Sequence, residues 1–174
     1  MKTSIGVLVL GGALLAGIAC APVAAQEPET QNPTPVVQFA PLSDADEATI
    51  IRLALGWALV DKNVPDYVIL DDKNFVVSLD GIDNILAPKL PGVNFIALNP
   101  KEVQDLADKN GNFGYLNIRD LRTNGGMVEV AVETRMAVAQ DSDILYLIGG
   151  GAVLQFEQVD GEWQITGQGA SWIS

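Results

Sequence analysis

The chain has 174 residues, with 10 Lys plus Arg against 22 Asp plus Glu, a net charge of −12, one cysteine and no histidine. This balance argues against nucleic-acid binding, because contacts to phosphates need a basic surface. The lack of histidine excludes Ser-His-Asp and Cys-His catalysis as well as a Cys/His zinc site.

The first 25 residues have the pattern of a cleavable secretion signal. Lys2 precedes an apolar run over residues 5–19, and small residues lead up to a cut after Ala25. A retained membrane anchor is the alternative, but it needs about 18–25 apolar residues. We therefore expect export to the periplasm or the cell exterior.

A second processing site competes with the first. The segment Gly17-Ile18-Ala19-Cys20 resembles the lipobox of bacterial lipoproteins, in which the cysteine is lipidated. That family usually has Leu or another aliphatic residue where Gly17 stands. The resemblance implies a lipid anchor at Cys20. We expect the protein to associate with a membrane only through this anchor. Both processing sites remain open.

Three parts follow from this organisation: a signal over 1–25, a Pro-rich linker over 26–41 and a single domain over 42–174. In the domain, Ser43 predicts the start of a helix that runs to about Val60, with acidic residues in its first turn. Short strands are predicted over 67–70 and 75–79. An irregular stretch follows, and a short helix is predicted to begin at Pro100 and to reach about Ala107.

The last third of the chain is rich in predicted strands. They cover residues 115–121, 127–139, 144–158 and 163–173, with turn signals at 124–126, 141–143 and 160–161. Gly149-Gly150-Gly151 interrupts the third of them and predicts a bend or bulge rather than a phosphate-binding loop. The expected fold is α+β: a curved antiparallel sheet of four or more strands, packed through one face on a long N-terminal helix plus a short helix.

Few side chains suggest chemistry. Glu129 and Glu133 share a predicted strand face but lie about 13 Å apart, so we expect Glu133 to form an exposed pair with Arg135. The segment Asp108–Gly114 resembles the opening of an EF-hand loop, but Phe113 and Arg119 stand where that loop needs Gly and Glu. We expect a helix-ending turn there, and no metal site or cofactor.

Three tryptophans, Trp57, Trp163 and Trp172, could line a pocket, although packing in the core or at its rim is the more common role of such residues.

The second half of the chain is similar to the cystatin-like, cone-shaped fold of the nuclear-transport-factor-2-like group. The similarity lies in the order of elements, in residues 149–156, in the hairpin over 159–163 and in the ending Ser171-Trp172-Ile173-Ser174. Exported bacterial proteins of unassigned function in this group have similar endings. The resemblance implies a pocket between the sheet and the first helix, but no activity.

Two functions are compatible with these patterns. The first is a non-enzymatic exported domain that binds a small apolar ligand or an envelope protein. The second is an enzyme that uses acid–base chemistry in a cone-shaped cavity, with proton donors among Tyr67, Tyr115, Tyr146 and Asp120. Assembly or inhibition through an exposed sheet face is a third possibility.

Intact-mass analysis of the protein from its native host tests the predicted processing. Cleavage after Ala25 gives an unmodified chain that begins at Gln26. A chain that begins at a lipid-modified Cys20 would instead identify a lipoprotein, and retention of Lys2 would contradict both.

Overall fold

A computed structural model of the chain describes residues 42–71, 73–80, 82, 88–143 and 149–173. The predicted signal and linker, with Ala25 and Cys20, lie outside these residues, as does Tyr146. None of the helices in the described part is long and apolar enough to cross a membrane.

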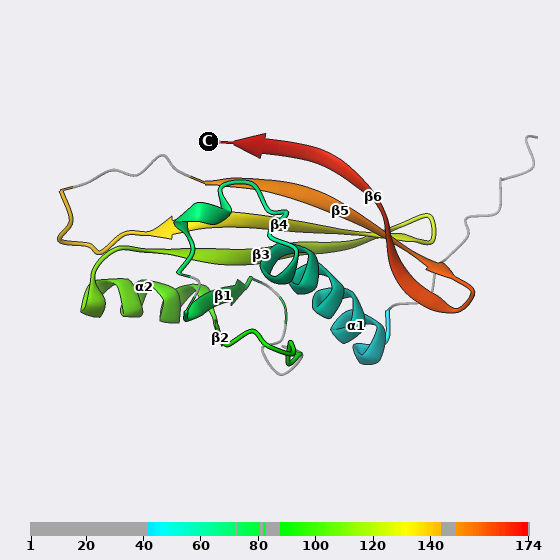
Figure 1. The fold of residues 1–174 in the computed structure, drawn as a ribbon, viewed down its shortest axis with the longest axis horizontal. Coiled ribbons are helices and arrows are strands. Elements are labelled where there is room, and N and C mark those ends of the chain that lie inside the picture. The colour runs from blue at the N-terminus through cyan, green and yellow to red at the C-terminus, as the bar shows by residue number, and fades with distance from the viewer. Residues whose placement is uncertain (1–41, 72, 81, 83–87, 144–148, 174) are drawn as a thin grey trace, which may run out of the picture. The chain divides into compact units, whose positions relative to one another are not determined.

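The described residues form an α+β domain around a curved, mixed sheet of six strands in the order β2-β1-β3-β4-β5-β6 (Figure 1). The helices are α1 (Asp44–Leu55) and α2 (Pro100–Asn110), and the strands are β1 (Phe75–Leu79), β2 (Phe95–Leu98), β3 (Phe113–Asn124), β4 (Met127–Ala137), β5 (Gly150–Val159) and β6 (Glu162–Ile173).

Helix α1 begins as the sequence predicts. The Ser43 hydroxyl accepts the backbone N–H of Asp46 at 3.2 Å, which satisfies one of the free donors of the first turn. The α-helix is shorter than expected, because a π-helical segment, Gly56–Val60, continues from Leu55.

The main core lies between α1 and one face of the sheet. Ile50 and Ile51 of α1 are fully buried, as are alternate residues of the central strands. Because successive strand residues point to opposite faces, this alternation leaves one apolar face turned to the helix. The strand residues at 0% exposure on this face include Val77, Leu116, Ile118, Val130, Val132, Leu154 and Phe156.

The expectation of an antiparallel sheet is wrong at one end. Strand β1 pairs in parallel with both β2 and β3, whereas β3 to β6 are antiparallel. Parallel strands need a crossover of about a dozen residues, and α2 provides it between β2 and β3. The sequence reading missed β2, whose four residues lie just before the helix cap Asn99.

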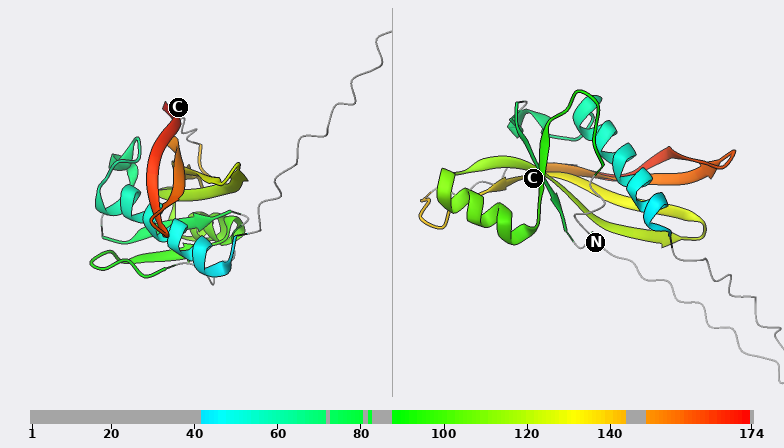
Figure 2. Two further views of the ribbon diagram at one scale, coloured as in Figure 1. Left: turned by 90° about the vertical axis from the view of Figure 1, so that its right-hand side faces the viewer. Right: turned by 90° about the horizontal axis from the view of Figure 1, so that it is seen from below.

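The helices also do not share one face. Val77 of β1 packs in the cluster that contains α1, whereas its neighbour Val76 packs with Val103 and Ala107 of α2. Neighbouring strand residues point to opposite faces, so the two helices cover different sides of the sheet (Figure 2, right). Helix α2 begins with a capping box between Asn99 and Glu102.

The strand predicted over residues 67–70 is also wrong. Residues Tyr67–Ile69 form a single turn of 3₁₀-helix, which follows Asp66 in a left-handed conformation (φ 54°). Leu70 makes only an isolated bridge to Gly114. Tyr67, Ile69 and Leu70 pack onto the core, whereas Val68 is 88% exposed.

The predicted turns of the last third are confirmed. Gly125 and Gly126 have φ of 61° and 89° and join β3 to β4, while Asp160 and Gly161 have φ of 55° and 83° and join β5 to β6. Positive φ at both central positions matches the twist of the flanking strands. The part of the third predicted strand over 144–148 lies outside the described residues.

A polar contact ties β6 to the start of α1. Ser43 donates its hydroxyl to one carboxylate oxygen of Asp46 at 2.6 Å, and the Trp163 indole N–H donates to the other at 2.7 Å. Both bonds favour the charged carboxylate, Ser43 more than Trp163, so they hold the pKa of Asp46 below its usual range.

Substituting Trp163→Phe tests this contact, because it keeps a ring against the core and removes the indole donor. The pKa of Asp46 should rise toward its ordinary value. In the wild type, the lowered pKa stabilises the folded state at pH values above the pKa of an unfolded aspartate. This stabilisation is lost as the pH falls through the lowered pKa. W163F should therefore lose less stability on acidification. Carboxyl titration by NMR, with unfolding midpoints at neutral and acid pH, would measure both effects, and an unchanged Asp46 pKa would contradict the account.

Candidate functional site

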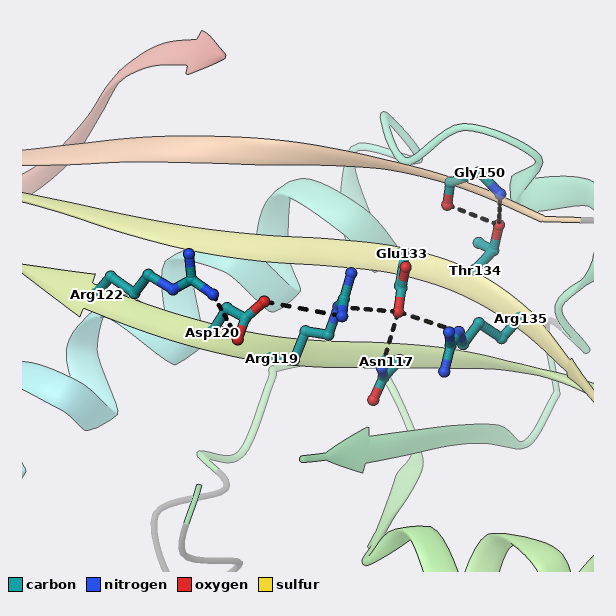
Figure 3. A network of polar contacts seen from close by, with 8 residues as sticks. All are labelled: Asn117, Arg119, Asp120, Arg122, Glu133, Thr134, Arg135 and Gly150. Atoms are coloured by element: carbon teal, nitrogen blue, oxygen red, sulfur yellow. Dashed lines mark hydrogen bonds and ion pairs between the residues drawn. The ribbon is translucent and has the colours of Figure 1, made fainter. Parts of the chain in front are cut away.

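A row of four residues crosses the sheet on the side opposite α1. Asn117 of β3 pairs with Glu133 of β4, Glu133 with Gly151 of β5, and Gly151 with Trp172 of β6. We call the side that carries this row the polar face. It contains a charged cluster that is larger than the exposed Glu133–Arg135 pair expected from the sequence (Figure 3).

Glu133 is the centre of the cluster. It is only 5% exposed, and its Oε1 accepts the Asn117 side-chain N–H at 3.0 Å. The same oxygen forms ion pairs with Nε of Arg135 at 3.1 Å and Nε of Arg119 at 3.3 Å. The predicted Glu133–Arg135 pair is present, but its carboxylate is buried rather than exposed. A buried carboxylate requires such partners, because removal from water penalises its charge.

The two arginines are not held equally. Three nitrogens share one oxygen, and Nε of Arg119 is buried without a hydrogen bond among the described residues. Charge attraction, rather than aligned hydrogen bonding, therefore holds that end of Arg119.

Both arginine side chains reach solvent, with 40% of Arg119 and 51% of Arg135 exposed. They approach the carboxylate from opposite sides (Figure 3). Arg122 lies beyond them and pairs with Asp120 at 3.2 Å. Three arginines and two carboxylates give this cluster a net charge of +1, in a chain whose net charge is −12 and which has four arginines in all.

Gly151 allows an aromatic ring to lie beside the cluster. A Cβ at this position would come within 2.7 Å of the Glu133 Cβ and would overlap the indole ring of Trp172. A Cβ at Gly150 would meet Pro65 at 2.7 Å and the Trp172 carbonyl oxygen at 2.8 Å. The expected bend or bulge is therefore not the main role of these glycines, which allow close packing on both faces. The irregularities of the β5–β6 pairing lie further along, after Ala152.

The proposed proton donors of an enzyme do not converge. Tyr67 packs in the core on the α1 side, with its ring 6.2 Å from that of Phe75. Tyr115 packs against Phe113 in the cluster under α2, on the other side of the sheet. Asp120 is paired with arginines at the edge of the polar cluster.

The EF-hand-like segment ends a helix, as predicted. Helix α2 stops at Asn110, and Gly111 caps it with φ of 87°. Asp108 accepts hydrogen bonds from the Gln104 side chain and the Gln140 backbone, and Asn112 accepts one from the Ala139 backbone. These oxygens fasten the end of α2 to the chain after β4. No group of three potential metal-binding acids occurs among the described residues.

The tryptophans do not form one pocket. Trp57 and Trp163 pack against the main core, whereas Trp172 lies on the polar face. The space between α1 and the sheet, where the resemblance implied a pocket, is filled in the described region by buried apolar side chains such as Ile51 and Val130.

Two hollows open beside the short strand β2. One, of about 360 Å³, is mostly apolar, with Phe75, Val76 and Leu106 among its lining residues and Asn74 and Asn94 as its amides. The other, of about 410 Å³, lies along residues 88–97. Neither contains a residue of the polar cluster.

Comparison with known proteins finds no matching family model, no matching curated protein and no matching solved structure.

The sequence reading missed Asn117 and Arg119 as members of the site. Their signal was weak, because each is an ordinary polar residue in alternation with the apolar Leu116 and Ile118. Only the pairing of β3 with β4 brings them to Glu133.

Replacing Glu133 tests whether the carboxylate organises the cluster. Glu133→Ala should lower the free energy of unfolding by about 1–3 kcal/mol, because Asn117 and two arginines lose their shared acceptor. Glu133→Gln keeps an acceptor for Asn117 and should cost less. Urea denaturation would measure both, with Glu129→Gln as the control on the same strand and face. Equal effects of E133A and E129Q would show that the cluster adds no stability.

Proposed function

We propose that this chain is an exported, non-enzymatic binding module that takes a carboxylate-bearing ligand on its polar face, through Arg119 and Arg135. The observation that carries the proposal is the pair of half-exposed guanidinium groups held on either side of one buried carboxylate. Ordinary surface arginines are mobile and lose side-chain entropy when they bind. Here Glu133 has already restricted both.

The charge of the cluster supports a ligand with one negative charge. Three of the four arginines of the chain lie in this cluster, whereas the chain as a whole has a net charge of −12. A guanidinium presents paired N–H donors that match the two oxygens of a carboxylate. Glu133 engages both arginines through Nε, and Arg119 Nη1 lies 3.8 Å from Asp120, so the terminal nitrogens that form no ion pair among the described residues are the donors available to a ligand.

Trp172 supports a ligand that also has an apolar part. Its ring lies over Gly151, beside Glu133, and is half-buried. Aromatic rings next to polar groups provide contact area for the apolar part of a ligand. The proposed ligand class is therefore a small aromatic or aliphatic carboxylate, free or as part of an envelope protein.

The alternative functions have less support. An enzyme of the kind considered above needs two titrating groups in one cavity. Tyr67 lies on the α1 side of the sheet, whereas Tyr115 and Asp120 lie on β3, about 16 Å apart along the strand. A purely apolar ligand would suit the hollow lined by Phe75 and Leu106. That hollow has amides but no charged group to orient a ligand.

Benzoate and benzamide form a matched pair of probes, equal in shape and different in charge. Benzoate should bind with a Kd on the order of 1 mM, as expected for so small a ligand, and should shift the NMR signals of the Trp172 indole and of the Arg119 and Arg135 side chains. Arg119→Gln or Arg135→Gln should weaken binding about tenfold, while Arg52→Gln, on the exposed side of α1, should not.

Several outcomes would contradict the proposal. Equal binding of benzamide would show that charge is not recognised. Shifts centred on Phe75 and Leu106 would identify the apolar hollow as the site. If R119Q is too unstable to test, Arg119→Lys keeps the charge, loses the paired donors and should still weaken benzoate binding.

A further inference from the structure

Strand β6 forms one edge of the sheet, and it is much longer than the strand at the other edge. It has 12 residues and pairs with β5 on one side, with no strand on its other side among the described residues. The opposite edge, β2, has only four residues and is followed directly by Asn99 and Pro100. Short edges next to proline are protected from further pairing, whereas long ones are not.

Strand β6 also lacks the residues that usually protect an edge strand from pairing with another strand. Glu162 is its only charged residue, and it contains no lysine, arginine or proline. Most of its residues are exposed, and Ile173 is 74% exposed. In a chain with 32 charged residues, this strand is unusually neutral. Lysine and proline are the residues with which proteins normally prevent edge-to-edge pairing.

We propose that β6 pairs antiparallel with β6 of a second copy of this chain, which joins the two sheets across a two-fold axis near Gly167. This inference is independent of carboxylate binding.

Charge supports a second copy as the occupant. In such a pair, the two Glu162 residues lie at opposite ends of the seam, about 30 Å apart at 3.3 Å per residue. That separation exceeds the Debye length of about 8 Å at physiological salt. The seam itself therefore carries no like-charge contact between strands, although each chain is strongly acidic.

Strand shape supports the same occupant. The pairing of β6 with β5 shifts register twice, between Ala152 and Leu154 and between Gln155 and Phe156, with an extra β6 residue each time. Bulges of this kind increase the local twist. A regular, weakly twisted strand would match this edge poorly, whereas a second β6 has the same bulges and the same twist.

The pairing has a consequence for the polar face. A two-fold axis between antiparallel strands stands perpendicular to the sheet, so the equivalent faces of both copies lie on the same side. Trp172 is itself a residue of β6. The two polar clusters would therefore share one continuous face.

Sedimentation equilibrium, on the protein produced from its complete coding sequence, tests the pairing between about 1 µM and 1 mM. The wild type should show a reversible monomer–dimer equilibrium. The double substitution Gln164→Lys and Gln168→Lys adds charge to exposed positions of β6. It should raise the dimer Kd about tenfold or more, because each change occurs twice in a symmetric seam. Circular dichroism would check that the variant is folded.

Gln158→Lys on β5 is the matched control, exposed and one strand inward from the edge. It makes the chain less acidic by one charge and should leave the dimer unchanged or slightly strengthen it. A monomer at every concentration would overturn the proposal, as would equal dimer Kd values for the double variant and the control.

Hydrogen exchange distinguishes a second copy from the chain's own residues as the segment that covers the edge of β6. Exchange protection of β6 amides should increase with protein concentration if a second copy covers the edge. Protection that is independent of concentration in a monomer would mean that the chain's own residues cover it, and that result would overturn the proposal. A dimer in which β6 gains no protection would overturn it equally.

Discussion

One extra residue in β3 is the constraint on which the polar face depends. The Gly125-Gly126 turn pairs Asn124 with Met127 and would, if continued without interruption, place Ile118 opposite Glu133. That register would set a buried apolar side chain against a carboxylate. The register shift between Arg119 and Arg122 moves the pairing by one residue, so that Ile118 meets Val132 and Asn117 meets Glu133. Asp120, with φ of 56°, lies in this bulge, and a left-handed residue is common in bulges.

The same shift explains why the two sides of the sheet are so different. On the α1 side, the core residues of β3 and β4 meet directly and exclude water. On the other side, the shift aligns Asn117 and Arg119 with a carboxylate that cannot be buried without donors. The candidate site is thus a by-product of matching apolar residues in the core. Because its arginines are partly exposed, the proposed ligand could reach them.

The two ends of the sheet differ, and no further strand lies beyond β6 among the described residues. The crossover helix α2 covers one side of β1, and the edge beyond it is a strand of only four residues. At the other end, β6 is long, twisted and nearly uncharged. The proposed binding and pairing surfaces both belong to this half of the sheet, where Trp172 connects them.

Local chemistry was readable from the residues alone wherever a few neighbours set the backbone. Ser43 and Pro100 predict where the two helices start, and the alternating valines predict the core face of β4. The hairpin turns are predicted by Gly125-Gly126 and Asp160-Gly161. Each of these effects acts within a few positions of the chain.

Contacts between distant segments could not be predicted in this way. The strand β2 is too short to give a periodic signal, and its parallel partner lies about twenty residues away. Burial of Glu133, by donors from another strand, depends on a register that a bulge alters, and the role of Gly151 depends on a ring from β6. Such features arise when the strands come together, since only then does a charge lose water or a missing Cβ make room for a neighbour.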